Sequence, residues 1–467
     1  MVVLGISLGL GSGAVGAFVA VALILALAAA VYVARVVDPA WILSAGIAAD
    51  VFAARGSKLG IPVGPSRLLL AAGSLALLAR ATDGWKRPLS LKLRPLHWLL
   101  IVVVAWAVVS GILSGSFSNH DSIWELVDRL GAAPFWMFFI APLAFGTEEQ
   151  RRILLGTLVV LGGYLGLTAL FETLHLNALV WPKYILDPAY GSHGDRARGP
   201  FVEAIANGLG LYACGVAAAM GLAVWRRPWV RRGCALVVGL CAAGCLFTLT
   251  REIWIGAAAG TLLALAGFHE LRRYLAPALV TGLLITLLSL ALIPGFSSSL
   301  SGRAHDQSPI WVRKNVARAA VNMIDARPLL GFGWNNFEKD SLPYFRQANS
   351  YPLDGLGVPV HNVFLLTAVE LGLVGGALWA LALFLSVGAA IFSSGGPPEL
   401  RVWRIGLLAI FVELLVVANF GPSTYPFPTL LLWTWAGLVG SPLTLPETAP
   451  AAEAERVGSP RLAPAPG

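Results

Sequence analysis

The amino-acid sequence predicts an all-α, polytopic membrane protein with about 12–13 transmembrane helices and one large outer loop that contains an amphipathic helix. Of the 467 residues, 57% are hydrophobic and only 12% are charged, whereas soluble domains carry about 25% charged residues. Apolar runs of roughly 20 residues, long enough to cross a bilayer, recur along the chain. Glycine (51) and tryptophan (16) are frequent, as in membrane helices that pack closely and end at the interface.

The predicted spans follow one another at short intervals. They are residues 14–35, 39–54, 64–80, 95–115, 124–145, 152–172, 201–224, 233–250, 252–268, 274–294, 361–392, 404–420 and 427–441. The short runs 39–54 and 427–441 are compatible with tilted or re-entrant helices. We divide the chain into N-terminal helices (1–150), central helices (151–294), a large periplasmic loop (295–360), C-terminal helices (361–442) and a disordered tail rich in Pro and Ala (443–467).

Basic residues cluster between the spans, and their distribution predicts the orientation. The clusters are segments 80–94 and 226–232, with Arg272, Arg273, Arg401 and Arg404. All fall on one side if the spans alternate, and the positive-inside rule makes that side cytoplasmic. We therefore attribute the net charge of +8 to orientation and not to nucleic-acid binding. Arg55 and Lys58 fall on the other side, so the orientation of the first two helices stays open.

The segment 295–360 is the longest polar interval between spans, and loops of this length are usually functional or disordered. Within it, SPIWVRKNVARAAVNMIDARP predicts an amphipathic helix that begins with Ser308 as N-cap and Pro309 at the first position and stops at Pro328. Its apolar stripe consists of Val312, Val316, Ala319 and Met323. Its basic residues Arg313, Lys314 and Arg318 are interpreted as a solvated or headgroup-facing surface.

Three places on the predicted outer side carry notable residues at helix ends, and two of them contain arginines. Arg196 and Arg198 precede the span 201–224, and Arg251 lies in a tight turn between two spans. Guanidinium groups stay charged and bind phosphate oxygens in a bidentate fork. The arginines therefore predict a site for a diphosphate presented by a membrane-embedded lipid carrier.

His361 and Asn362 open the span that follows the large loop. The dipole of that helix favours the neutral form of the histidine, which can then accept a proton from a sugar hydroxyl. Together with the arginines, this histidine would suffice for glycosyl transfer from a lipid diphosphate. Glu203, near the start of the span 201–224, is a supporting residue that can also serve only as a structural partner for an arginine.

Each of these residues also has a structural interpretation. Arg196 and Arg198 can contact lipid headgroups, Arg251 can terminate its turn, and a backbone carbonyl can satisfy His361. The sequence has no acidic metal-binding motif, so we expect neither a metal nor a cofactor, and arginine would serve as the cation. The cysteines are interpreted as small core residues; they are Cys214, Cys234, Cys241 and Cys245.

Four stretches, in order, resemble the O-antigen ligase and polymerase family of bacterial membrane glycosyltransferases. They are RARGPF, TLTREIWIGAAAG, the segment from Arg303 through WVRKNVARAAVNMIDARPLLGFGWNNF, and VHNVFLLTAVELGLVGG. The resemblance covers roughly residues 150–390. It implies an inverting, metal-independent transferase of the inner membrane, with its site facing the periplasm and a glycan on undecaprenyl diphosphate as donor.

Within this resemblance, Arg198 and Arg251 match the arginines that bind the diphosphate, Arg196 and Arg303 match the same role less closely, and His361 matches the candidate base. Thr248 and Thr250 replace serines that are common in the family before the arginine. The stretch PFVE after the Arg-Gly pair is similar to exopolysaccharide-type members. The acceptor stays open among another lipid-linked repeat, a lipid core and a protein hydroxyl.

Two other classes of function remain. A transporter, such as a flippase for lipid-linked glycans, also spans the membrane many times, but many transporters contain repeated halves and ionisable residues at the midplane. We find no internal repeat, and the notable charges gather on one face. A purely structural membrane protein would need no converging arginines. The sequence therefore favours a glycosyltransferase whose partners are the lipid-linked donor, the acceptor glycan and membrane lipids.

Overall fold

The computed structural model describes residues 36–53, 64–82, 91–191, 194–293, 296–298, 301, 308–348, 350–421 and 425–445. Within these ranges the chain is helical and contains no β-strand. Every predicted apolar run that falls inside them forms helix, whereas the run 14–35 lies outside them. The main helices are α3 (Pro39–Ala49), α4 (Pro65–Thr82), α5 (Pro95–Leu113), α6 (His120–Glu125), α7 (Ala132–Ala144), α8 (Glu148–Thr173), α9 (Ala204–Val224), α10 (Pro228–Phe247), α11 (Arg251–Gly267), α12 (Leu275–Leu292), α14 (Ser308–Ala326), α15 (Phe337–Asp340), α16 (Val363–Ile391), α17 (Leu400–Phe420), α18 (Pro426–Val439) and α19 (Ser441–Thr444).

Length and hydropathy identify membrane-spanning helices within the described residues. Seven helical segments are long and apolar enough to cross a membrane. They are Pro95–Leu113, Asp121–Ala144, Glu148–Thr173, Ala204–Val224, Pro228–Phe247, His269–Leu292 and Val363–Ile391. Pro39–Ala53 and Pro426–Val439 are shorter apolar helices. The structure thus confirms an all-α, polytopic membrane protein.

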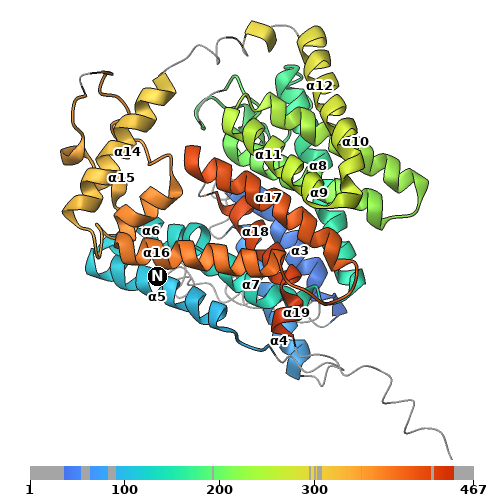
Figure 1. Cartoon of the computed structure of the whole chain (residues 1–467), viewed down its shortest axis with the longest axis horizontal. Coiled ribbons are helices and arrows are strands. Elements are labelled where there is room, and N and C mark those ends of the chain that lie inside the picture. Colours follow the sequence, from blue (N-terminus) through green and yellow to red (C-terminus); the bar gives the residue numbers. More distant parts are fainter. Residues whose placement is uncertain are drawn as a thin grey trace, which may run out of the picture.

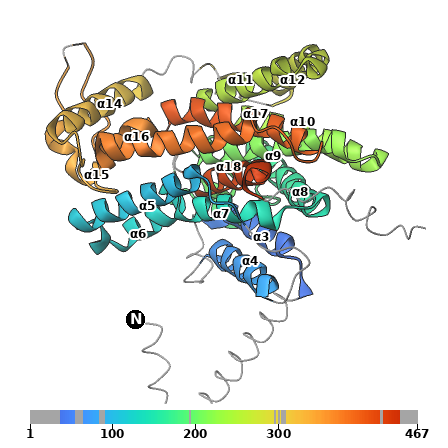
Figure 2. The same cartoon turned by 60° about the horizontal axis from the view of Figure 1, so that its bottom comes forward.

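The helices form two groups joined through a central layer. The group α8 to α12 lies on one side and the group α5, α6, α14, α15 and α16 on the other, with α17 and α18 between them (Figure 1). Figure 2 shows the same division from a second direction. α11 packs along α17, α18 packs along α7, and α16 packs along α5. The central helices therefore connect the segment that carries the arginine motifs to the one that carries His361.

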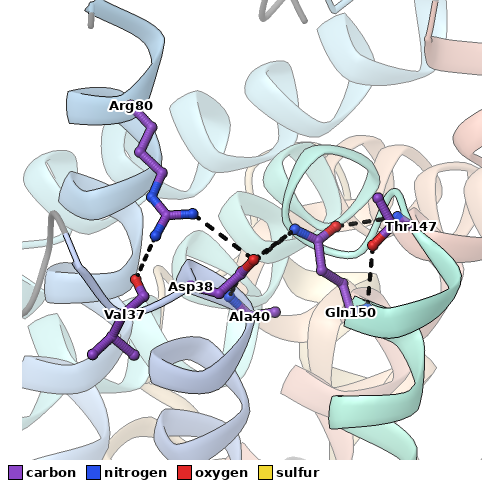
Figure 3. A network of polar contacts seen from close by, with 6 residues as sticks. All are labelled: Val37, Asp38, Ala40, Arg80, Thr147 and Gln150. Atoms are coloured by element: carbon purple, nitrogen blue, oxygen red, sulfur yellow. Dashed lines mark hydrogen bonds and ion pairs between the residues drawn. The ribbon is translucent and has the colours of Figure 1, made fainter. Parts of the chain in front are cut away.

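One polar network defines an end of this bundle (Figure 3). Asp38 caps α3 by accepting from the Ala40 amide at 2.9 Å, and it also accepts from Gln150 Nε2 at 3.2 Å. Arg80, near the end of α4, donates to the Val37 carbonyl at 2.9 Å. These contacts bring the start of α3, the end of α4 and the start of α8 together. We call this the Asp38 end of the bundle, and we call the opposite end, where α8 runs into the segment 174–203, the loop end.

The structure differs from the predicted span 361–392 in one respect: α16 is broken at Gly372, whose backbone has φ 71° and ψ 173°. At 1.5 Å per residue the two pieces, residues 363–371 and 373–391, are about 14 Å and about 28 Å long. Only the second piece matches the roughly 30 Å hydrocarbon thickness of a bilayer. The first piece, which follows His361, is too short to cross a bilayer by itself.

The loop of residues 328–333 in the outer segment pairs with the backbone at this break. The amides of Phe332 and Gly333 donate to the carbonyls of Val369 and Glu370, both at 2.9 Å. The Leu373 amide donates to the Pro328 carbonyl at 2.7 Å. Trp106 Nε1 from α5 donates to the Leu371 carbonyl at 3.0 Å. Backbone groups that a helix break releases must find partners when they are buried, and these contacts provide them.

The predicted amphipathic helix is confirmed as α14. Val316, Ala319 and Met323 of its apolar stripe are buried. They pack with residues of the following loop and of the first piece of α16, namely Phe332, Phe337, Phe345, Val360, Leu366 and Val369. Ser308 is the first helical residue and not the cap, and the helix ends at Ala326, before Pro328. The outer segment thus has a small core of its own, built onto α16.

The C-terminal helix α19 packs against the start of α5. It covers Ser441–Thr444. The Lys92 amide donates to the Thr444 carbonyl at 2.7 Å, and Arg94 Nε donates to the Leu443 carbonyl at 2.9 Å. These contacts tie α19 to the start of α5. The remainder of the predicted tail, residues 446–467, lies outside the described residues.

We expect Gly372→Ala to destabilise the protein. A Cβ at this position would lie 2.0 Å from the Leu329 carbonyl oxygen, and the backbone has a positive φ. Unfavourable backbone angles alone cost about 1–3 kcal/mol. Gly388→Ala is the matched control, because it lies in the same helix and its Cβ meets nothing within 4 Å. Thermal unfolding in detergent should show a lower Tm for Gly372→Ala only. Equal Tm values for the two variants would contradict the requirement for glycine at the break in α16.

Candidate functional site

Arg198 is an internal support of the segment 174–203. Its side chain is 4% exposed, and its terminal nitrogens donate to the carbonyls of Tyr190 at 2.7 Å and Ile185 at 2.8 Å. The carboxylate of Glu172, in the last turn of α8, accepts from the backbone amides of Arg198 at 3.2 Å and Gly199 at 2.9 Å. The Arg-Gly pair is thus held through both its backbone and its guanidinium group.

The next contacts connect this segment to the turn before α11. The Ala197 amide donates to the Phe247 carbonyl, at the end of α10, at 3.1 Å. Asn207 Nδ2 of α9 donates to the Ala197 carbonyl, also at 3.1 Å. A Cβ on Gly199, which has φ +55°, would lie 2.4 Å from Asn207 Oδ1, so only glycine fits there. The first two predicted motifs therefore lie side by side.

The turn Thr248–Thr250 places Arg251 at the surface. Thr248 Oγ1 donates to the Cys245 carbonyl at 2.7 Å, and Thr250 Oγ1 donates to the Thr248 carbonyl at 2.9 Å. Both threonines are buried, whereas Arg251, the first residue of α11, is exposed. Its guanidinium group has no hydrogen bond or ion pair within the part of the chain that the structure describes. The hydroxyls therefore satisfy the turn, and the arginine stays available to a ligand.

Glu252, the neighbour of Arg251, points into the protein. It is 7% exposed, and its Oε1 lies 3.1 Å from Nη2 of Arg313 on α14. Arg313 thus does not belong to the solvated surface that the sequence suggested, whereas Lys314 and Arg318 are exposed as predicted. This ion pair joins the outer segment to the turn that presents Arg251.

Arg313 also influences His361. Burial lowers the pKa of the imidazole below its ordinary value of 6.5, and the positive charge of Arg313 lowers it further, while the Pro359 carbonyl acts in the opposite direction. Nδ1 of His361 is buried and has no hydrogen-bond partner among the described residues. The lowered pKa favours the neutral imidazole, which is the form that can accept a proton. The neutral form was predicted from the helix dipole, but burial is the larger cause.

Asn362 orients this histidine. Its Oδ1 accepts from the Leu365 amide at 3.0 Å and caps α16, and its Nδ2 donates to Asn419 Oδ1 of α17 at 3.2 Å. The side chain therefore fixes the start of α16 against α17, the helix along which α11 packs. The predicted His-Asn pair is thus positioned by the same central helix as the Arg251 turn.

Tyr425, directly before α18, is close enough to Glu203 and Glu252 for their charges to act on it. Burial raises the pKa of its hydroxyl, and the carboxylates of Glu203 and Glu252 raise it further. Glu203 is the N-cap residue of α9. Burial raises the pKa of this carboxyl, and Arg196 and Arg198 oppose that change. Tyr425 thus brings Glu203, with the nearby Arg196, into the same neighbourhood as Glu252.

The structure therefore gathers most of the predicted residues at the loop end. Arg251 adjoins Glu252, which pairs with Arg313, and Arg313 acts on His361. Arg196 acts on Glu203, whereas Arg198 is buried and supports the loop. Arg303 lies outside the described residues. Within the described ranges, no group of three or more His, Cys, Asp or Glu side chains is placed to hold a metal ion. The four cysteines are buried and unpaired, as core residues are.

A family comparison covers the central part of this site. Residues 235–380 match the family model described as O-antigen ligase. This segment is similar to the O-antigen ligase family. The matched segment contains the Arg251 turn, α14 with Arg313, and the His361–Asn362 pair. It supports a glycan ligase or polymerase type of function for a multi-pass membrane protein. No curated protein matches the chain.

Three residues of the arrangement were not predicted: Glu172, Arg313 and Tyr425. Glu172 has a visible signal, because it is a carboxylate at the end of a long apolar run, next to the Arg-Gly segment. Arg313 sits among other basic residues of an amphipathic helix, and its sequence context does not distinguish it from Lys314. Tyr425 has no distinguishing signal, because its importance depends on which helices surround it.

We expect Arg313→Gln to raise the pKa of His361. Removing a nearby positive charge makes the imidazolium less unfavourable, so the pKa moves upward, while burial still keeps it below its ordinary value. Titration of labelled histidine by NMR in nanodiscs would measure the shift. Arg318→Gln removes an exposed charge from the same helix and should leave the pKa unchanged. An unchanged pKa in Arg313→Gln would show that this guanidinium group does not act on His361.

Proposed function

We propose that the protein transfers an oligosaccharide from an undecaprenyl diphosphate donor to an acceptor hydroxyl at the loop end of the bundle. The observation that carries this proposal is that Arg313, which lowers the pKa of His361, is also paired with Glu252, the neighbour of the exposed Arg251. A base and an anion-binding group are the two requirements of such a transfer.

The reaction follows from these two groups. The acceptor oxygen attacks the anomeric carbon of the donor sugar, and His361 takes the proton that the hydroxyl loses. The bond between that carbon and the diphosphate oxygen breaks, and the diphosphate leaves with the electron pair. Arg251 and Arg196 stabilise its negative charge, as guanidinium groups do for phosphates. A single displacement of this kind inverts the configuration at the anomeric carbon.

The remaining residues have supporting tasks in this proposal. Arg198 holds the segment that carries Arg196, because its terminal nitrogens donate to backbone carbonyls of that segment. A direct contact between Arg198 and the diphosphate stays a prediction. Glu203 interacts electrostatically with Arg196. Asn362 caps α16 and thereby fixes the backbone next to His361. Arg303 remains a predicted diphosphate contact outside the described residues. The acceptor remains a glycan on a lipid carrier, a lipid core or a protein hydroxyl.

The proposed orientation places the loop end in the periplasm of a bacterium, with the protein in its inner membrane. Two pairs of arginines lie near the Asp38 end. Arg151 and Arg152 are near the start of α8, beside Gln150. Arg272 and Arg273 follow the end of α11, which begins at the loop end. By the positive-inside rule that end faces the cytoplasm.

We expect a membrane-impermeant thiol reagent to label Lys314→Cys but not Arg272→Cys in intact cells. Labelling of Arg272→Cys alone would contradict the proposed orientation.

One observation favours the flippase alternative. Glu413 lies within α17, is 1% exposed, and its Oε1 has no hydrogen-bond partner among the described residues. Carboxylates inside membrane helices often mark transport pathways. The alternative requires Glu413→Gln to abolish movement of a labelled lipid-linked glycan across vesicles while His361→Ala leaves it intact. The transferase proposal requires His361→Ala to abolish glycan transfer while Glu413→Gln leaves it intact.

We expect His361→Ala and Arg251→Ala to reduce transfer strongly in a reconstituted assay. The assay supplies undecaprenyl diphosphate oligosaccharide and an acceptor glycan, and it measures released undecaprenyl diphosphate and lengthened glycan. Loss of a general base lowers kcat by about 10²- to 10⁴-fold. Loss of one charged hydrogen-bond donor lowers kcat/KM by about 10- to 100-fold.

The controls are residues of the same type at the Asp38 end. His269 is largely exposed, so His269→Ala should retain full activity, as should Arg272→Ala. Arg251→Lys should recover part of the activity, since it keeps the charge but loses the bidentate fork. Wild-type turnover in both His361→Ala and Arg251→Ala would refute the proposed site.

A further inference from the structure

A cavity of about 640 Å³ lies between α4 on one side and α7 and α18 on the other. This volume is within the range of ligand-binding pockets. Along α4 its lining includes Arg67, Ala71 and Leu75, and the facing wall includes Trp124, Asp128 and Leu430. α4 packs mainly on α3, which leaves this space open beside it.

The polar residues of the cavity gather at one end. Arg67 forms an ion pair with Asp128 and stacks over the Trp124 ring at 3.9 Å. Ser66 donates to Asp50 Oδ1 at 2.5 Å. α4 runs from these residues towards Arg80, which belongs to the Asp38 end. The polar end of the cavity therefore lies towards the loop end of the bundle.

The rest of the cavity is apolar and opens sideways. Leu68, Leu75, Leu78 and Trp136 line it and are each about half exposed. In a membrane, a surface with these side chains faces hydrocarbon. From Arg67 to Leu78 the helix rises by about 16 Å, so the walls extend about halfway through a bilayer core of about 30 Å. A hydrocarbon chain can enter such a groove from the lipid.

The cavity adjoins the candidate site through the start of α18. Pro426 and Leu430 of α18 line it, and Tyr425, which precedes them, lies near Glu203 and Glu252. Asp128 lines it as well, and the charge of the next residue, Arg129, acts on Tyr425. On α18 the lining of the cavity thus begins directly after Tyr425 of the candidate site.

We propose that this cavity binds part of the long polyprenyl chain of the donor lipid while the diphosphate rests at the Arg251 turn. This inference rests on the proposed function. A phospholipid would have to place its phosphate at the mouth, but Arg67 is the single guanidinium group of the described lining and is already paired with Asp128. A carrier whose phosphates are held elsewhere needs only the apolar walls.

We expect Ala71→Trp to fill the cavity and to reduce the use of long-chain donors. The test compares kinetics with an undecaprenyl donor and with a donor that has a chain of two or three isoprene units. KM for the long donor should rise at least about tenfold, corresponding to about two methylene groups that lose their burial. KM for the short donor and kcat for both should stay unchanged. An equal effect on both donors would overturn the inference.

Val160→Trp is the matched control, because it adds the same side chain at a position of α8 that is 75% exposed. A photoreactive undecaprenyl phosphate, which cannot transfer sugar, measures binding in a His361→Ala background. It should label α4 and α7 peptides, and Ala71→Trp should abolish this labelling. Absent labelling, or stronger labelling there by a photoreactive phosphatidylglycerol, would refute the chain site. Labelling without transfer in the wild type would instead refute the proposed function alone.

Discussion

The arrangement of the site depends on the ion pair between Glu252 and Arg313. Glu252 is almost fully buried, whereas Arg313 is partly exposed and comes from a separate segment of the chain. Removing one partner of a buried pair leaves an uncompensated charge in a medium of low dielectric constant, which is costly. The pair therefore holds α14 at one position over α11. Because Arg313 also acts on His361, the same contact couples the Arg251 turn to the candidate base.

A second constraint determines where His361 lies relative to the membrane-spanning part of α16. The break at Gly372 separates residues 363–371, which follow His361, from the longer piece of this helix. The loop that contains Phe332 and Gly333 supplies the hydrogen bonds that the break would otherwise lose. The Gly-x-Gly stretch of the outer segment and the Glu-x-Gly stretch of α16 are therefore two sides of one structural joint. They position the site without taking part in its chemistry.

The arginines of the loop end divide into those that the protein holds and those that it leaves open. Arg198 donates to carbonyls of its own loop, and Arg313 is paired with Glu252. Arg251 is exposed and has its turn satisfied by threonine hydroxyls. Guanidinium groups that are already bonded stabilise the scaffold, while an unbonded one keeps its hydrogen-bonding capacity for a ligand. The cavity beside α4 adds an apolar counterpart to this charged surface.

The sequence by itself determined the fold class, the positions of the helices and most of the candidate residues. Hydrophobic runs and proline, threonine and asparagine caps act locally, so they can be read along the chain, as α14 and the Asn362 cap show. Only the tertiary structure decided the break at Gly372, the inward turn of Glu252 towards Arg313, and the internal role of Arg198. These features depend on contacts between segments far apart in the sequence. The physical reason is that a charged side chain looks the same in sequence whether it meets a carboxylate, a carbonyl or water, and packing alone determines which one it meets.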